Sequence, residues 1–157
     1  MKGSGMSLES TRNFRQVSDT VTTSGTVPAD DLAELRAKGY ELVVNLMPDS
    51  SEYAVADEAA IVRGQGIDYV YIPVDFAAPN HDQFEAFAAA MDANADKTIH
   101  VHCAANYRVS AFYSLLAMRH GWWSVEQADA HLRGIWTEGE YPVWDEFIAA
   151  ERARLGS

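Results

Sequence analysis

The sequence predicts an α/β fold with a mainly parallel central sheet of four to five strands, flanked by helices and followed by a helical C-terminal part. Three short runs of β-branched or aromatic residues, at 41–46, 69–74 and 98–102, alternate with stretches of helical apolar spacing. Such alternation indicates βαβ units, in which the strands run parallel. The 157 residues, 48% of them hydrophobic, suffice for one globular domain with a substantial core.

The elements follow in order from Pro28. This proline suits a first helical position and Gly39 a helix end, so a helix is predicted between them. The run 41–46 is then a buried strand, 54–63 a short helix ended by glycines, and 69–74 a second strand.

The remaining elements rest on similar signals. Apolar residues spaced i, i+3, i+4 and i+7 give the next helix an apolar face. A serine followed three residues later by glutamine has the pattern of a capping box. The predicted elements are an edge strand at 14–17, a helix around 84–91, a third buried strand at 98–102, and helices at 108–120, from Ser124, and around 144–148.

Composition and charge narrow the function. The chain has 12 Lys and Arg against 23 Asp and Glu, a net charge of −11, which argues against nucleic acids and anionic membranes as partners. With a single cysteine, no internal disulfide can form. No apolar run has the length of a membrane span or signal peptide, so a cytoplasmic location is expected. We expect residues 1–10 to be a disordered tail or cloning remnant and 11–157 to be one domain.

The lone cysteine lies where a predicted strand passes into a helix, in the run 102–110. Free backbone N–H groups at a helix N-terminus favour a thiolate, and together with Arg108 they would bind a tetrahedral oxyanion such as phosphate. The alternative is that Cys103 is a small buried apolar residue, as most free cysteines are. The order of strand, cysteine, short loop, arginine and helix favours the reactive interpretation.

The sequence His102-Cys103, with Arg108 and Ser110, resembles the signature loop of the cysteine-dependent protein tyrosine and dual-specificity phosphatases. The resemblance is to small bacterial members similar to beta-lactamase hydrolase-like proteins. The segments 22–25, 44–46 and 71–74 extend it, and it covers about residues 13–132.

The resemblance implies a phosphatase-like fold and a phosphocysteine mechanism that needs neither cofactor nor metal. Cys103 would attack phosphorus, Arg108 would hold the phosphoryl oxygens, and Ser110 would help the cysteine depart. His102 would support the loop, and the phosphate-binding residues would be Ala104, Ala105, Asn106, Tyr107 and Arg108. The expected substrate is a small or weakly charged phosphoester or a phosphoprotein, and the loop would also take phosphate or sulfate ions.

The loop departs from the usual pattern in two places. Four residues, 104–107, separate cysteine and arginine where the family has five, although Ser110 keeps its place at Cys+7. The arginine is thus one position early, with Val109 in its slot. Asn106 stands where glycine is usual, and asparagine tolerates the left-handed conformation. The short spacing also resembles rhodanese-like sulfurtransferases, so a Cys103 persulfide carrier and a catalytically silent phosphate-binding module remain alternatives.

The general acid should come from another loop at the same sheet edge. Asp75 directly follows the second predicted strand and is the first choice, and Asp82 is the second. Each also has a structural explanation, because Asp75 could stabilise a turn and Asn80 or Asp82 could cap the next helix. His100 and His102 share a strand face, but two histidines without a third ligand seldom bind metal.

Overall fold

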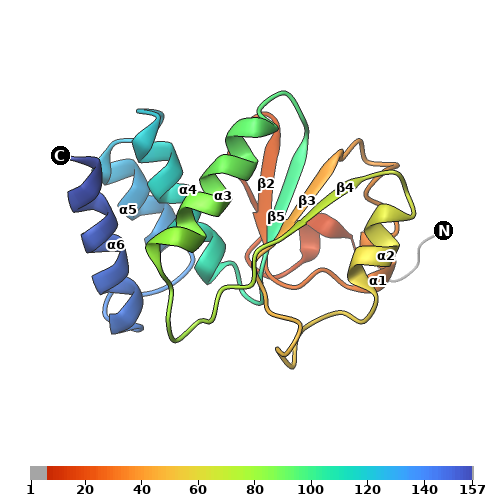
Figure 1. The fold of residues 1–157 in the computed structure, drawn as a ribbon, viewed down its shortest axis with the longest axis horizontal. Coiled ribbons are helices and arrows are strands. Elements are labelled where there is room, and N and C mark those ends of the chain that lie inside the picture. The colour runs from red at the N-terminus through yellow and green to blue at the C-terminus, as the bar shows by residue number, and fades with distance from the viewer. Residues whose placement is uncertain (1–6, 157) are drawn as a thin grey trace.

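The computed structural model describes residues 7–156 and contains a five-stranded sheet between two unequal helical layers (Figure 1). The order across the sheet is β1-β2-β5-β3-β4. The strands are β1 (Arg15–Gln16), β2 (Val21–Ser24), β3 (Leu42–Asn45), β4 (Asp68–Tyr71) and β5 (Ile99–His102). The pairs β2–β5, β5–β3 and β3–β4 are parallel and only β1 runs antiparallel to its neighbour. The predicted fold class is confirmed.

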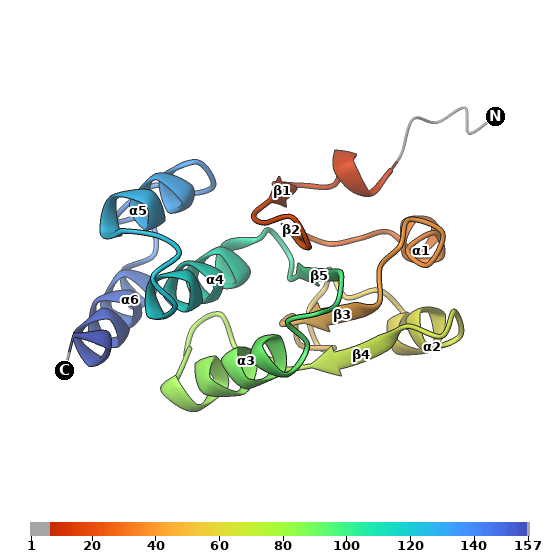
Figure 2. The ribbon, with the colours of Figure 1, turned by 90° about the horizontal axis from the view of Figure 1, so that it is seen from above.

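The helices divide between the two faces of the sheet. Figure 2 shows α1 and α2 on one side and α3 and α4 on the other, with α5 and α6 farther out beyond α4. The helices are α1 (Ala29–Leu32), α2 (Glu58–Arg63), α3 (His81–Ala93), α4 (Tyr107–Arg119), α5 (Val125–Arg133) and α6 (Pro142–Leu155), and a 3-10 turn, η1, spans Leu8–Ser10. Within residues 7–156, no helix is long and apolar enough to cross a membrane.

Each face of the sheet buries its own core. The larger core joins β3 and β5 to α3, α4 and α6, with Phe84, Phe112 and Trp144 fully buried at its centre. The smaller core packs η1, α1 and α2 against the other face around Leu8 and Leu35. Because α4 is buried along most of its length, the loop that leads into it is held on a rigid support.

The strand β2 was not predicted, because its sequence, Val-Thr-Thr-Ser, lacks the apolar run of the other buried strands. It lies between β1 and β5 and all four of its residues are buried. Its hydroxyls bind a histidine on β5, so polar pairing takes the place of apolar packing. The other strands lie within the predicted runs or one residue outside them.

Two helices are shorter than predicted. The helix expected from Pro28 to Gly39 is α-helical only at Ala29–Leu32 and continues as turns. The helix expected from residue 54 begins at Glu58, because Asp57 adopts the left-handed conformation (φ 62°) just before it. Both helices pack on the smaller core, which short helices are long enough to cover.

The N-terminal boundary also differs from the expectation that residues 1–10 form a tail. Leu8 is completely buried in the smaller core, and Leu8–Ser10 form the turn η1. The packed part of the chain therefore begins before residue 11. Residues 1–6 lie outside the described part of the chain.

Candidate active site

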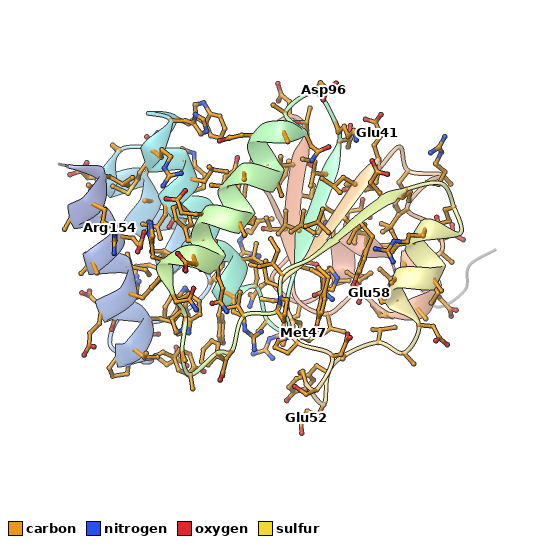
Figure 3. The ribbon with its side chains drawn as sticks, in the orientation of Figure 1. Glu41, Met47, Glu52, Glu58, Asp96 and Arg154 are labelled. Carbon is orange, nitrogen blue, oxygen red and sulfur yellow. The ribbon has the colours of Figure 1, made fainter. Side chains whose placement is uncertain are left out.

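The carboxyl ends of β3, β4 and β5 meet at one edge of the sheet, where a cavity of about 280 Å³ opens. In Figure 3, Met47 and Glu52, which follow β3, lie at this end of the molecule, and Glu41 and Asp96 lie at the other. Ligands of open α/β sheets bind at the carboxyl edge. The cavity is lined by Arg12, Ser51, Tyr53, Phe76, Cys103, Ala104, Ala105, Tyr107, Arg108 and Tyr141.

Cys103 follows β5 directly and is 1% exposed. Its backbone N–H donates to the Ser24 carbonyl at 3.3 Å, so the pairing of β2 with β5 extends to the cysteine itself. The helix α4 begins only four residues later, at Tyr107. The positive end of its dipole therefore lies near the sulfur, an arrangement that favours a thiolate.

The loop after Cys103 is fastened from outside by its carbonyl groups. The Ala104 carbonyl accepts from the Thr26 N–H at 3.1 Å, and the Ala105 carbonyl from Asn13 Nδ2 at 3.0 Å. In a planar trans peptide the C=O and N–H point in opposite directions, so the N–H of Ala105 points away from Thr26. A Cβ at Gly25 would lie 2.5 Å from the Ala104 carbonyl oxygen, so only glycine permits this approach.

Asn106 makes the turn from the loop into α4. Its φ of 70° is left-handed, as expected for the residue that replaces the usual glycine. Its Nδ2 donates to the Asn13 carbonyl at 2.8 Å and to Thr23 Oγ1 at 3.0 Å. The side chain thereby fixes the turn to two other segments.

Arg108 lies in the first turn of α4 and lines the same cavity as Cys103. It is 8% exposed, and its Cζ lies 5.3 Å from the centroid of the Phe76 ring. Its Nε is buried and has no hydrogen-bond partner among residues 7–156. A buried guanidinium with an unpaired N–H is poised to receive an anion from the cavity.

Ser110 lies apart from this cavity, although its residue number fits the family pattern. It is completely buried, donates to the Tyr107 carbonyl at 2.9 Å and accepts from Trp136 Nε1 at 3.2 Å. The bond from Trp136 fixes α4 against the segment that follows α5, and the bond to Tyr107 lies within α4. The structure does not place the hydroxyl among the groups that line the Cys103 cavity.

The two candidate acids do not line the cavity. Asp75 is exposed, and its Oδ1 accepts from the Ala77 N–H at 3.0 Å, a turn-stabilising bond. Asp82 is exposed in the first turn of α3, which Asn80 caps. The next residue after Asp75, Phe76, does line the cavity, and none of the lining residues, all within 7–156, is Asp or Glu.

Aromatic side chains form much of the cavity wall, and of these only Tyr107 was assigned to the site from the sequence. The Phe76 ring lies 4.9 Å from that of Tyr141 and 6.3 Å from that of Tyr107. Burial, and then the charge of Glu140, raises the pKa of Tyr141. These rings come from three separate segments, so their convergence is visible only in the folded chain.

Behind the loop, His102 forms a buried pair with Glu58 through its Nε2. Figure 3 shows Glu58 on α2. Burial raises the pKa of the nearby Tyr69, whose hydroxyl accepts from Asn45 Nδ2 at 2.9 Å. The sequence reasoning missed Glu58. The available signal was that Glu58 and Val62 lie four residues apart and so share the buried face of a helix.

His100, two residues before His102, joins β5 to β2. Its Nδ1 lies 2.7 Å from Thr22 Oγ1 and its Nε2 lies 2.8 Å from Ser24 Oγ. Burial, and then the neighbouring His102, holds the pKa of His100 well below its ordinary value. Both ring nitrogens are thus engaged with hydroxyls in the structural frame of the sheet.

Comparison with sequence families gives a match over residues 13–119, to the phosphatase-like domain of beta-lactamase hydrolase-like proteins. A beta-lactamase hydrolase-like protein of Xylella fastidiosa is 25% identical over 144 residues, which cover 88% of this chain and 33% of that protein. One from Agrobacterium fabrum is 26% identical over 103 residues, covering 64% of this chain and 24% of that protein. The chain thus spans a third or less of these curated relatives.

Structural comparison points the same way. A DUF442 phosphatase from Shewanella putrefaciens CN-32 is 37% identical, with a TM-score of 0.83 and coverage of 94% of this chain and 93% of that one. TpbA of P. aeruginosa is 15% identical with a TM-score of 0.71, covering 93% and 92%, and shares the fold. The descriptions of these relatives do not name a sulfurtransferase, so the comparisons add no support to a persulfide carrier.

Proposed function

Because the chain belongs to the family of phosphatase-like domains of beta-lactamase hydrolase-like proteins, we propose that it hydrolyses phosphate monoesters through a phosphocysteine on Cys103. Relatives of phosphatase fold support a phosphatase activity. A cysteine-to-serine variant of TpbA has been solved with phosphotyrosine, an aryl phosphate. The substrate and the chemistry proposed for this chain rest on the cavity around Cys103.

One observation carries the proposal: Cys103 and Arg108 line the same cavity, and the buried guanidinium has an N–H without a partner among residues 7–156. A buried cation is costly unless an anion pairs with it. A phosphoryl group in the cavity would supply that anion, and the guanidinium would bind two of its oxygens. The arrangement thus suits a phosphate ester positioned for attack by sulfur.

The proposed reaction has two steps. The Cys103 thiolate attacks phosphorus, a P–S bond forms, and the P–O bond to the leaving group breaks. Water then attacks the phosphocysteine, the P–S bond breaks, and inorganic phosphate and the thiolate are released. Arg108 and the N–H of Ala105 stabilise the charge on the equatorial oxygens in both steps.

The leaving group takes up a proton in the first step. Asp75 is the proposed donor, and a change in the turn that it stabilises would bring its carboxyl towards the cavity. A phenol, with a pKa of about 10, leaves with less help than an alkyl alcohol, whose pKa is far higher. With an aromatic wall and no lining carboxylate, the cavity favours aryl phosphates.

Release of phosphate from phenyl phosphate, followed in the wild type, Cys103→Ser and Arg108→Lys, tests this function. We expect the wild type to turn over and to be inhibited by vanadate. Cys103→Ser should lose at least about 1,000-fold in kcat, and Arg108→Lys about 100-fold or more in kcat/KM. Equal rates in the wild type and Cys103→Ser would overturn the proposal.

A further inference from the structure

Arg12 is held at the Cys103 cavity by the catalytic loop itself. The Arg12 carbonyl accepts from the Gly25 N–H at 2.7 Å. Its neighbour Asn13 adopts a left-handed φ of 54° and makes two hydrogen bonds to the loop, one to the Ala105 carbonyl and one from Asn106 Nδ2. The backbone of Arg12 is therefore fixed with respect to the residues that would bind the phosphoryl group.

The Arg12 side chain is exposed and lines the cavity together with Arg108. Its Cζ lies 5.9 Å from the centroid of the Tyr107 ring, and its Nη2 lies 3.5 Å from the Tyr107 hydroxyl. Among residues 7–156, the recorded partners of this guanidinium are that ring and hydroxyl. In a chain of net charge −11, this exposed cation at the cavity has no recorded carboxylate partner among residues 7–156.

A series of contacts through a pair of rings links the two guanidiniums. Arg108 lies 5.3 Å from the Phe76 ring, the rings of Phe76 and Tyr107 are 6.3 Å apart, and Arg12 lies 5.9 Å from Tyr107. An aromatic substrate whose phosphate is bound by Arg108 would pack against these rings. The far side of its ring would then face Arg12.

We propose that Arg12 binds a second anionic group, so that the preferred substrates are aryl phosphates that carry a carboxylate on the ring. This inference rests on the proposed function, because it takes Arg108 as the site of the phosphoryl group. One additional carboxylate is attracted by the local cation. An extended polyanion would instead meet the negative charge of the rest of the molecule.

The test compares phenyl phosphate with 3- and 4-carboxyphenyl phosphate in the wild type and Arg12→Gln. Because Arg12 is exposed, the effect should be moderate: for the better carboxylated ester, the wild type should show about five- to tenfold higher kcat/KM, expressed mainly in KM. Arg12→Gln should bring the ratio close to one. The control is Arg36→Gln, which removes an exposed arginine bound to the Gly66 carbonyl, away from the cavity, and should keep the wild-type ratio.

Binding separates this inference from the proposed function. In a Cys103→Ser background, the dissociation constants of the same esters are measured by calorimetry with and without Arg12→Gln, so no turnover is required. A preference for the carboxylated ester that disappears with Arg12 supports the inference, even if the wild type hydrolyses neither ester and the proposed function fails. Equal affinities for both kinds of ester, or a preference that survives Arg12→Gln, would overturn it.

Discussion

Arg108 lies one position earlier than the arginine of the usual phosphatase loop, and the backbone at Asn106 accounts for its reaching the cavity. The left-handed turn at Asn106 starts α4 at the very next residue. Neighbouring residues of a helix are rotated by about 100°, so Arg108 faces the cavity while Val109 enters the larger core. With the arginine one position early, Arg108 thus lines the cavity and Val109 packs in the core.

The turn at Asn106 gives the first prediction. Alanine there would meet the penalty of a left-handed φ, about 1–2 kcal/mol, and would lose the bonds to Asn13 and Thr23. Glycine would lose only the bonds. We expect Asn106→Ala to lower the free energy of unfolding by about 2–4 kcal/mol and Asn106→Gly by about 1–2 kcal/mol, measured with urea. Equal losses would show that the φ of this residue carries no cost.

The two carboxylates near the cavity give the second prediction. If Asp75 is the acid, Asp75→Asn should lower kcat about 100-fold for an alkyl phosphate and much less for p-nitrophenyl phosphate, whose leaving group needs little protonation. The matched variant Asp82→Asn, at an exposed position in α3, should leave both rates within about twofold. A uniform loss in Asp75→Asn for both esters would instead assign the residue to the turn.

At the scale of residues, the sequence predicts which residues belong to the site better than it predicts where their side chains point. The order of Cys103 and Arg108 along the chain is readable, and both line one cavity. Ser110 turns towards Trp136, and Asp75 binds the backbone of its own turn. Both contacts depend on side-chain rotation, which cannot be deduced from the spacing of residues along the sequence. The contribution of Arg12 depends on bonds between segments more than ninety residues apart.

At the scale of elements, β2 shows the limit of hydrophobic patterns. Thr22 and Ser24 lie on one face of this strand and hydrogen-bond to the two nitrogens of His100 on β5. Buried histidines on the third predicted strand need hydrogen-bond partners. The hydroxyls of Thr22 and Ser24, two residues apart and earlier in the sequence, could have been recognised as such partners. The signal was therefore present, but as chemical complementarity between strands and not as a run of apolar residues.

Helix boundaries were predictable where a side chain caps the helix. Asn80 and Ser124 each accept from a backbone N–H in the first turn and complete capping boxes, as the sequence indicated for α5. The start of α2 has no such side-chain cap and is set by the left-handed Asp57. That conformation gives no reliable sequence signal, because few non-glycine residues adopt it, even though aspartate is enriched among them.

The packing of α5 gives the third prediction, which concerns pH. His131 packs its ring 4.9 Å from that of Trp123, and burial, followed by the charge of Arg15, lowers its pKa from 6.5 to about 4. The unfolded chain therefore binds a proton between pH 6.5 and 4 that the folded chain does not, so stability falls as the pH falls through this window.

His131→Phe keeps an aromatic ring and removes this titration. When the pH falls from 7.5 to 5.0, we expect the free energy of unfolding of the wild type to decrease by about 1–2 kcal/mol more than that of His131→Phe. Urea unfolding at both pH values measures it. His120, bonded to Asp92 on the surface, supplies the comparison, and His120→Phe should not show this shift in the variant's favour. If the stability difference between His131→Phe and the wild type is the same at both pH values, burial does not lower the pKa of His131.

At the scale of the whole molecule, the two cores have different roles. The larger core supports α4 and with it the end of the loop that follows Cys103. The smaller core holds η1, which leads through Thr11 into the segment of Arg12 and Asn13 that is bonded to the loop. The N-terminal residues are thus part of the site's framework, and their polar sequence gave little sign of it.

Leu8 tests whether the packed domain starts before residue 11. Its side chain is completely buried in the smaller core, so Leu8→Ala should lower the free energy of unfolding by about 2–4 kcal/mol, and Leu8→Met, which keeps the volume, by less than about 1.5 kcal/mol. A tail would show no change in either variant. Because η1 leads into Arg12, Leu8→Ala should also weaken the preference for carboxylated aryl phosphates while the protein remains folded. A large loss of stability with the preference intact would show that the bonds of Asn13 to the loop suffice to position Arg12.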